Sequence, residues 1–256
     1  MLIYKITAEF YVESGAFMKR EKKIKIAIEQ LAETDSTNDY LAKLCNQGNI
    51  EEFYTERTEY QTSGKGQRGN SWESEPGKNL LFSFVFYPTA LEAKSQFNLS
   101  MLVATGLVDA LSGYTDGFSI KWPNDIYWKD QKIAGILIEN MLEGKYISQC
   151  IVGIGLNVNQ TVFHSSAPNP ISLAQIIGKE IDREELFKKD RIHVAEVLDH
   201  LDYFVDAAHH SPVVVFRSLS VEQVEHSVLV LHAAVIKRLS HRVLVLVRAI
   251  CNVKHV

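Results

Sequence analysis

The spacing of apolar residues divides much of the 256-residue chain into strands. Apolar and polar residues alternate at Ile24, Ile26 and Ile28, and again over residues 53–60, as expected for strands with one buried face. Residues 79–87 are almost wholly apolar or aromatic, which predicts a strand covered on both faces. Four more strands, separated by turn residues, are predicted at 118–122, 126–128, 132–139 and 146–157.

Two longer helices are predicted from apolar spacing and from their end signals. The run Asp35–Thr37 offers side-chain oxygens that cap a helix start, so we expect a helix over residues 38–45. Apolar residues at helical spacing predict a second helix over residues 95–111, ended by Gly113. Shorter helices are predicted at 172–177 and 182–189.

Consecutive strands joined by short turns, with few helices, indicate an α+β sheet rather than a βαβ array. We place this domain at residues 24–189, after an N-terminal extension of residues 1–23. Beyond it the composition changes, because the last glycine is Gly178 and eight of the nine histidines lie from His193 onward. A compact β-barrel uses glycines in its turns, so residues 190–256 form a divergent segment without an assigned fold.

The composition excludes several classes of protein. The formal net charge of −4 argues against a nonspecific polyanion binder, and no apolar run reaches the ~18–20 residues of a membrane span. The N-terminus lacks the pattern of a signal peptide. Cys45, Cys150 and Cys251 are odd in number and far apart, which indicates reduced thiols rather than disulfides or a zinc site. We therefore expect a cytoplasmic protein without a membrane partner.

The run Gln61–Trp72 carries the clearest chemical signal in the chain. Three glycines alternate there with Lys65, Gln67 and Arg68. Glycine turns expose backbone N–H groups, and the two cations add positive charge, a combination suited to a phosphate or another anion. Taken alone, such a loop is equally compatible with a plain turn.

A second run, Lys121–Asp125, places a lysine, a tryptophan, a proline and two turn-forming polar residues in one bend. Proline fixes the turn and favours an extended conformation before it. Asn124 and Asp125 suit either a capped hairpin corner or a ligand, and both interpretations stay open. Lys132 begins the next strand, and Gly135 allows close approach of a ligand or a backbone. Fixed cations suit adenylate formation, in which a carboxylate and a triphosphate must meet.

Weaker signals lie elsewhere. The run Ser36–Asn38 is first of all a helix cap, although a helix start also presents N–H groups to a ligand. The run Gly153–Asn159 closes a strand with glycines and amides and suits either a turn or a nucleotide site. The pair His209–His210 lacks the partner ligands that a metal site needs.

In their order and spacing, these motifs resemble the catalytic domain of biotin protein ligases. The resemblance covers about residues 24–189 and rests on residues 34–38, 61–72, 121–125, 132–139 and 153–157. It implies a mixed, mainly antiparallel sheet flanked by helices, like that of class II aminoacyl-tRNA synthetases. It also implies a cytoplasmic ligase that forms biotinyl-5′-AMP from biotin and ATP, with Mg²⁺ accompanying the ATP. A lysine of a biotin carboxyl carrier domain would then accept the biotin.

The resemblance also implies roles for individual residues. Lys132, Arg68 and Asp125 would take part in catalysis. The biotin-binding set would be Ser36, Thr37, Asn38, Gln61, Lys65, Gly66, Gln67 and Lys132. The nucleotide-binding set would be Lys65, Arg68, Trp72, Asn124 and Asn157. No metal ligand of the protein itself is implied.

The chain departs from the family in three places. Many relatives carry arginine where Gln67 stands, and the neighbouring Arg68 is the candidate substitute. Too few residues precede Ile24 for the helix-turn-helix domain of the larger relatives, so DNA binding is not expected. The glycine-containing pattern of the family's usual C-terminal SH3-like domain is not found after residue 189. Because relatives often dimerise through the sheet, a homodimer is a further expectation.

Two other functions stay open on this basis. Lipoate ligases and octanoyl transferases resemble this fold and also use a lysine, although the Trp-Pro-Asn-Asp run favours biotin. The alternative from a different class is a non-catalytic biotin or nucleotide binder, with an intact pocket and a defective C-terminal region.

Overall fold

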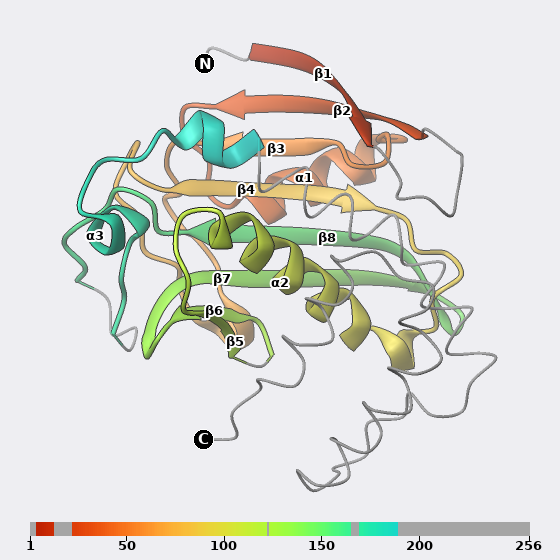
Figure 1. The fold of residues 1–256 in the computed structure, drawn as a ribbon. Coiled ribbons are helices and arrows are strands. Elements are labelled where there is room, and N and C mark those ends of the chain that lie inside the picture. Colours follow the sequence, from red (N-terminus) through yellow and green to blue (C-terminus); the bar gives the residue numbers. More distant parts are fainter. Residues whose placement is uncertain (1–3, 13–21, 122, 165–168, 189–256) are drawn as a thin grey trace, which may run out of the picture.

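A computed structural model describes residues 4–12, 22–121, 123–164 and 169–188. Within these ranges the chain forms one eight-stranded sheet flanked by helices (Figure 1). The strands are β1 (Tyr4–Val12), β2 (Lys22–Leu31), β3 (Thr55–Thr58), β4 (Leu80–Phe86), β5 (Phe118–Lys121), β6 (Asp125–Trp128), β7 (Gln131–Glu143) and β8 (Tyr146–Leu156). The helices are α1 (Thr37–Gln47), α2 (Phe97–Ser112) and α3 (Leu173–Ile177), and residues 183–188 are also helical.

The strand order places β4 and β8 at the centre of the sheet. Across the sheet the order is β1-β2-β3-β4-β8-β7-β6-β5. The strands β2 and β3 pair in parallel, with α1 between them in the chain, and every other neighbouring pair is antiparallel. The predicted α+β fold with a mixed, mainly antiparallel sheet is therefore confirmed.

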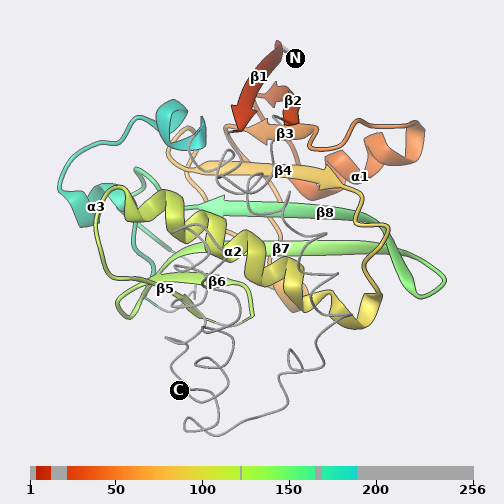
Figure 2. The ribbon, with the colours of Figure 1, turned by 45° about the vertical axis from the view of Figure 1, so that its right-hand side comes forward.

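Helices cover both faces of the sheet (Figures 1 and 2). The helix α2 packs on one face, where the main core includes Phe82 and Leu107. The helix α1 lies on the opposite face, where Leu41 packs with Val85 of β4 and Ile151 of β8. All seven side chains of β4 are buried, as predicted for a strand covered on both faces. The site described below lies on the α1 face.

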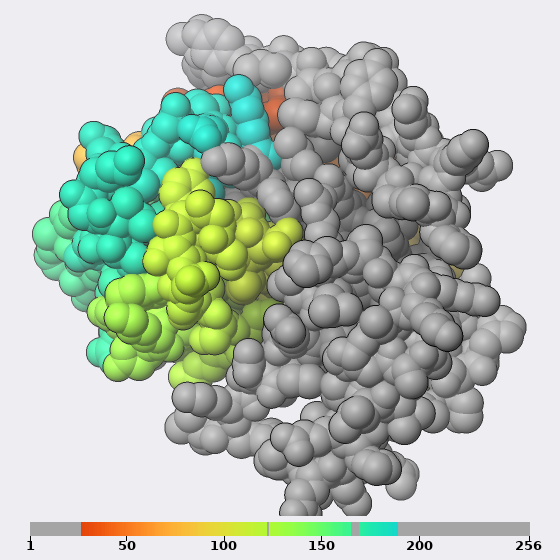
Figure 3. All heavy atoms as spheres, viewed as in Figure 1, coloured from red at the N-terminus to blue at the C-terminus, as the bar shows by residue number. Residues whose placement is uncertain are grey.

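Residues 183–188 close the core on the α2 face beside β3. The Phe187 ring meets Phe82 edge-on, with 5.1 Å between the ring centroids, and the Arg57 guanidinium lies 4.8 Å from the Phe187 centroid. Arg57 is almost fully buried and pairs with Glu184 at 2.6 Å, so its charge is compensated where it enters the core. In Figure 3 the atoms of residues 169–188 and of α2 lie next to each other on this side.

Several element boundaries differ from the predictions, and β7 continues to Glu143 beyond its predicted end at residue 139. The strand β3 is shorter than residues 53–60, because Phe53 adopts a left-handed conformation (φ 62°) that interrupts the extended chain. The segment assigned to an N-terminal extension contains β1, which pairs antiparallel with β2. Trp122 and the divergent segment 190–256 lie outside the described residues. In the part that is described, no helix has both the length and the apolar character to cross a membrane.

Two buried carboxyl groups lie side by side beneath α1. Glu29 of β2 and Glu56 of β3 are register partners, and both are almost fully buried. The Tyr40 and Tyr54 hydroxyls donate to Glu29 at 3.2 and 2.6 Å, whereas no described group is hydrogen-bonded to either oxygen of Glu56. Burial, followed by the charges of Glu29 and Asp35, raises the pKa of Glu56 to about 8. Glu56 is therefore mainly protonated at neutral pH.

We predict that Glu56→Gln stabilises the domain at pH 8 but not at pH 5. Between the ordinary carboxyl pKa of 4.5 and about 8, the folded chain holds a proton that the unfolded chain has released. Stability therefore falls as the pH rises through this window, by up to about 3 kcal/mol at pH 7. The amide has no such proton, so the gain in melting temperature over the parent protein should grow from pH 5 to pH 8.

Thermal unfolding across this pH range tests the prediction, with Glu33→Gln as the control because Glu33 is exposed. The control should track the parent protein at every pH. If the difference in melting temperature between Glu56→Gln and the parent is the same from pH 5 to pH 8, then Glu56 is already ionised in the folded protein across this range.

Candidate active site

A pocket opens on the α1 face of the sheet, between β7, β8, the first turn of α1 and the Gln61–Trp72 loop. Its lining includes the glycines Gly135, Gly153 and Gly155. Of the predicted site residues, the pocket is lined by Ser36, Thr37, Asn38, Gln61, Lys65, Gly66, Gln67, Arg68, Trp72, Asn124, Asp125 and Lys132. Motifs that are up to about a hundred residues apart in the chain therefore meet at one place.

Glycines on β7 and β8 make room for the Trp72 indole. A Cβ atom at Gly155 would overlap the indole, and one at Gly135 would lie 2.9 Å from Trp72 Cζ3. Contacts this short do not occur between real carbon atoms, so either alanine would displace the ring. The half-buried indole therefore lies flat against a part of the sheet that carries no side chains.

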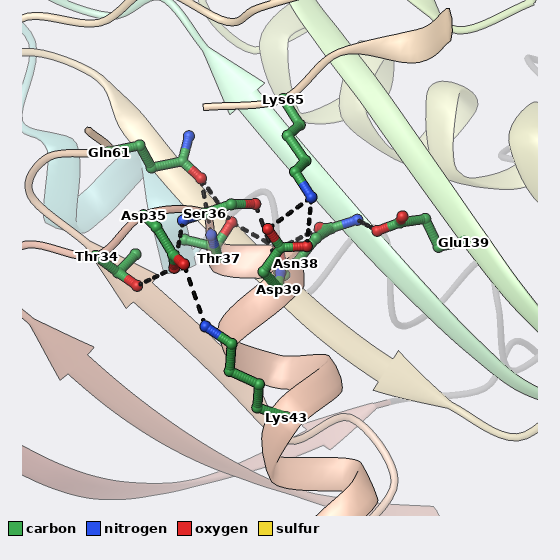
Figure 4. Close-up of polar contacts among 11 residues, drawn as sticks. Thr34, Asp35, Ser36, Thr37, Asn38, Asp39, Lys43, Gln61, Lys65 and Glu139 are labelled. Carbon is green, nitrogen blue, oxygen red and sulfur yellow. Dashed lines mark hydrogen bonds and ion pairs between the residues drawn. The ribbon is translucent and has the colours of Figure 1, made fainter. Parts of the chain in front are cut away.

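The first turn of α1 forms a polar wall of the pocket (Figure 4). Ser36 caps the helix, and its hydroxyl accepts from the Asp39 N–H at 3.5 Å. The Thr37 backbone N–H and hydroxyl both donate to Gln61 Oε1, at 2.8 and 3.1 Å. Because Oε1 is used in this way, Gln61 offers the N–H groups of its amide to the pocket.

Asn38 is held from two sides. Its Nδ2 donates to Glu139 Oε2 at 2.7 Å, and its Oδ1 accepts from the Ser83 hydroxyl at 2.6 Å. A Cβ atom at Gly153 would overlap Asn38 Oδ1, so glycine is needed there as well. Sequence reasoning missed Glu139 and Ser83 as parts of this site. For Ser83 there was a signal, because it is the single polar residue within Leu80–Phe86.

Lys65 is held against α1 by an ion pair. Its Nζ lies 2.6 Å from Asp39 Oδ2, and this hydrogen bond is the main cause that raises the pKa of Lys65 (Figure 4). The lysine is half-exposed and the aspartate is about one third exposed. Such an exposed pair is weak, so an anionic ligand can compete for the ammonium.

The tip of the Gly-rich loop is closed by its own backbone. The Gly66 N–H donates to the Asn70 carbonyl at 2.7 Å. Between them Gln67 begins a single 3₁₀ turn, and Arg68 adopts a left-handed conformation (φ 55°, ψ 34°) before Gly69 (φ 81°). Arg68 is exposed and lines the pocket, so its charge remains accessible to a ligand.

Lys132 stands at the start of β7 beside the Trp72 indole. Its Nζ lies 2.8 Å from Asp125 Oδ1 and 5.7 Å from the Trp72 ring centroid. The two charged side chains are each about one fifth exposed, at 19% and 21%. Partial burial strengthens this pair relative to the Lys65 pair, so Lys132 is held in a more defined position.

The two asparagines predicted to bind a nucleotide have different surroundings. Asn124 lines the pocket, but its Nδ2 donates to the Ile136 carbonyl at 3.0 Å. Asn157 is buried outside the lining, and its Nδ2 donates to the Ile171 carbonyl at 3.2 Å. The structure therefore does not bring Asn157 together with the other site residues. Its amide instead ties the end of β8 to the chain that leads into α3.

This arrangement suits the binding of a carboxylate and a phosphate close together, with a polar group of the ligand against the α1 wall. Lys65, Arg68 and Lys132 face one pocket, and the α1 wall supplies hydrogen-bonding groups beside them. In the described ranges, no three His, Cys, Asp or Glu residues are grouped in a way that could hold a metal ion. Cations that face one hollow can offset the repulsion between a carboxylate and a phosphate.

Known proteins have a similar sequence and fold. The sequence profile of the Biotin/lipoate A/B protein ligase family matches residues 31–157. The "Bifunctional ligase/repressor BirA" of Escherichia coli (strain K12) is 35% identical over 157 residues, which is 59% of this chain and 47% of that protein. The "Biotin--[acetyl-CoA-carboxylase] ligase" of Paracoccus denitrificans is 33% identical over 162 residues, which is 60% of this chain and 66% of the relative.

A solved structure extends this similarity to three dimensions. The biotin protein ligase of Aquifex aeolicus, in complex with biotin and ATP, is 32% identical and superposes with a TM-score of 0.58. The match covers 68% of this chain and 70% of the Aquifex chain. The present chain spans less than half the length of the Escherichia coli relative. Sequence, fold and pocket agree, and the chain belongs to the biotin/lipoate A/B protein ligase family.

Proposed function

We propose that the protein is an ATP-dependent biotin–protein ligase. The observation that carries this proposal is the convergence of Lys65, Arg68 and Lys132 on one pocket, beside the polar wall of α1. The Aquifex relative with the same fold holds biotin and ATP together. The Paracoccus relative is named for ligation to acetyl-CoA carboxylase, which supports a carboxylase carrier domain as the partner.

In the first step, a carboxylate oxygen of biotin attacks the α-phosphorus of ATP. The bond between that phosphorus and the bridging oxygen breaks, pyrophosphate leaves, and biotinyl-5′-AMP remains. Both reactants are anions, so fixed positive charge lowers the barrier. We assign this role to Lys132 and Arg68, with Lys65 nearer the α1 wall.

In the second step, the neutral amine of a carrier lysine attacks the acyl carbon of the adenylate. An amide bond forms, the bond from the acyl carbon to the phosphate oxygen breaks, AMP leaves, and the amine releases a proton. We assign to Lys132 the stabilisation of the charge on the departing AMP. Asp125, at 2.8 Å from Lys132, holds the ammonium in place for both steps.

The remaining pocket residues are assigned by their chemistry. Ser36, Thr37, Asn38 and Gln61 form a hydrogen-bonding wall for the ring system of biotin, and the loop residues Gly66 and Gln67 line the same pocket. The Trp72 indole offers a flat apolar surface for the adenine. Asn124 shapes the adjoining corner of the pocket. Mg²⁺ would arrive with the ATP phosphates, which supply the oxygen ligands it prefers.

Incubation of the full chain with biotin, MgATP and a purified biotin carboxyl carrier domain tests the proposal. We expect biotin on the acceptor, detected by a mass shift, and no label on an acceptor whose target lysine is replaced by arginine. Labelling with lipoate instead of biotin would favour the sister activity. Biotin binding without release of pyrophosphate would show a non-catalytic binder.

We predict that Lys132→Ala lowers the rate of adenylate formation by a factor on the order of 10²–10³, because the fixed charge next to the reacting anions is lost. Pyrophosphate release measures the rate, and circular dichroism checks the fold. Lys94→Ala is the control, because Lys94 pairs with Glu92 on the surface and does not line the pocket. Full activity of Lys132→Ala would remove this lysine from the mechanism.

Gln61→Ala should weaken biotin binding about tenfold, because one hydrogen-bonding amide of the wall is removed. Calorimetric titration with biotin measures the effect, and ATP binding should change little. Gln47→Ala serves as the control, since Gln47 is exposed at the far end of α1. Unchanged biotin affinity would place Gln61 outside the binding site.

Gly155→Ala should raise the KM for ATP about tenfold or more, because the new Cβ displaces the Trp72 indole that we assign to the adenine. Steady-state kinetics at saturating biotin measure this. Gly48→Ala is the matched control, because no atom lies within 4 Å of a Cβ built at Gly48. An unaltered KM for ATP would separate Trp72 from nucleotide binding.

A further inference from the structure

A hydroxyl group lies beneath the polar wall of the pocket without lining it. Ser83 is fully buried in the middle of β4, in a strand whose other side chains are apolar. Its side chain points to the α1 face, as does that of Val85 two residues later. A buried polar group in such a place needs a partner, and Ser83 has two.

The two partners are neighbours in the first turn of α1. The Ser83 hydroxyl lies 2.6 Å from Asn38 Oδ1 and 2.7 Å from Thr37 Oγ1. An amide oxygen can only accept, so the proton of Ser83 is directed to Asn38. The oxygen of Ser83 can then accept from the Thr37 hydroxyl, whose single proton alternates between Ser83 and Gln61 Oε1, while the Thr37 backbone N–H donates to Oε1 in either case. One serine thus connects two side chains that line the pocket.

Each partner is also held from its other side, so its orientation is defined. Glu139 accepts from Asn38 Nδ2 at 2.7 Å, which turns Oδ1 toward Ser83. Gln61 Oε1 accepts from the Thr37 backbone N–H at 2.8 Å. The chain of contacts from Glu139 to Gln61 therefore passes through Ser83, and its members Asn38, Thr37 and Gln61 line the pocket.

We propose that Ser83 is a positioning residue for the ligand wall, which sets the orientations of Thr37, Asn38 and, through Thr37, Gln61. The proposal rests on the proposed function in one respect, because it takes the ligand of this wall to be biotin. Ser83 does not touch the substrate. Removal of its hydroxyl leaves a buried amide oxygen of Asn38 without a donor, and Asn38 and Thr37 then lose their common contact.

A purely structural role for Ser83 would be to hold α1 against the sheet. Apolar packing also holds α1 there, because Val85 packs with Leu41 of α1 and Ile151 of β8. Val85→Ala removes part of this apolar contact on the same strand and the same face, but it leaves every hydrogen bond of the wall in place. It is therefore the matched control for Ser83→Ala.

The experiment compares the full chain with its Ser83→Ala and Val85→Ala variants. For Ser83→Ala we expect the Kd for biotin to rise at least tenfold, with the KM for ATP within twofold and a smaller loss of melting temperature than in Val85→Ala. For Val85→Ala we expect a lower melting temperature and a biotin Kd within twofold of the parent. If Ser83→Ala binds biotin as tightly as the parent, or if Val85→Ala weakens biotin equally, the positioning role is wrong.

Hydrogen exchange without ligand separates this proposal from the proposed function. The Thr37 amide donates to Gln61 Oε1, so a loosened wall should exchange at Thr37 at least tenfold faster in Ser83→Ala than in the parent. If the parent chain fails to bind biotin, the proposed function fails, while the exchange rate at Thr37 still decides whether Ser83 holds the wall. Unchanged exchange at Thr37 in Ser83→Ala would overturn the proposal.

Discussion

The pocket depends on the absence of side chains at three adjacent positions of the sheet. Gly135, Gly153 and Gly155 face α1, and a Cβ atom at each would meet the Trp72 indole or the Asn38 amide at less than contact distance. A sheet face covered by a helix is normally filled with interlocking side chains. Here the three glycines leave space above the sheet. The Trp72 indole and the first turn of α1 occupy part of that space, and the pocket is the remainder.

The charges of the pocket follow from the same layout. Lys65 and Lys132 each have a carboxylate partner, at Asp39 and Asp125, so two of the three cations that line the pocket are paired within the protein. The exposed pair at Lys65 is the weaker, and the part-buried pair at Lys132 is the more fixed. Lys132 is therefore already held in position for an anion that enters the pocket. Lys65 can leave Asp39 and bind the anion at a small cost in free energy.

The sequence predicted the elements and motif residues well where the signal is local. A capping signal located α1, apolar periodicity located α2 and the central strands, and the motifs assembled as expected except for Asn157. It missed Ser83 and Glu139, whose bonds to Asn38 span 45 and 101 residues of chain. Such contacts arise from the register of β4, β7 and β8, which no local spacing records. The late start of β3 after Phe53 was missed because a left-handed phenylalanine has no sequence signal.

The strand register also shows why the α1 face of the sheet contributes less to folding stability than a fully apolar face would. Glu29, Glu56, Ser83 and Gly153 are successive register partners on β2, β3, β4 and β8, so these four neighbouring positions of the sheet beneath α1 carry no apolar side chain. Replacement of such a row by packed aliphatic residues would stabilise most sheets. It would also remove the hydroxyl that holds the wall and fill the hollow next to it. A protein that binds ligands on a sheet face under a helix start must therefore forgo part of its core at that place.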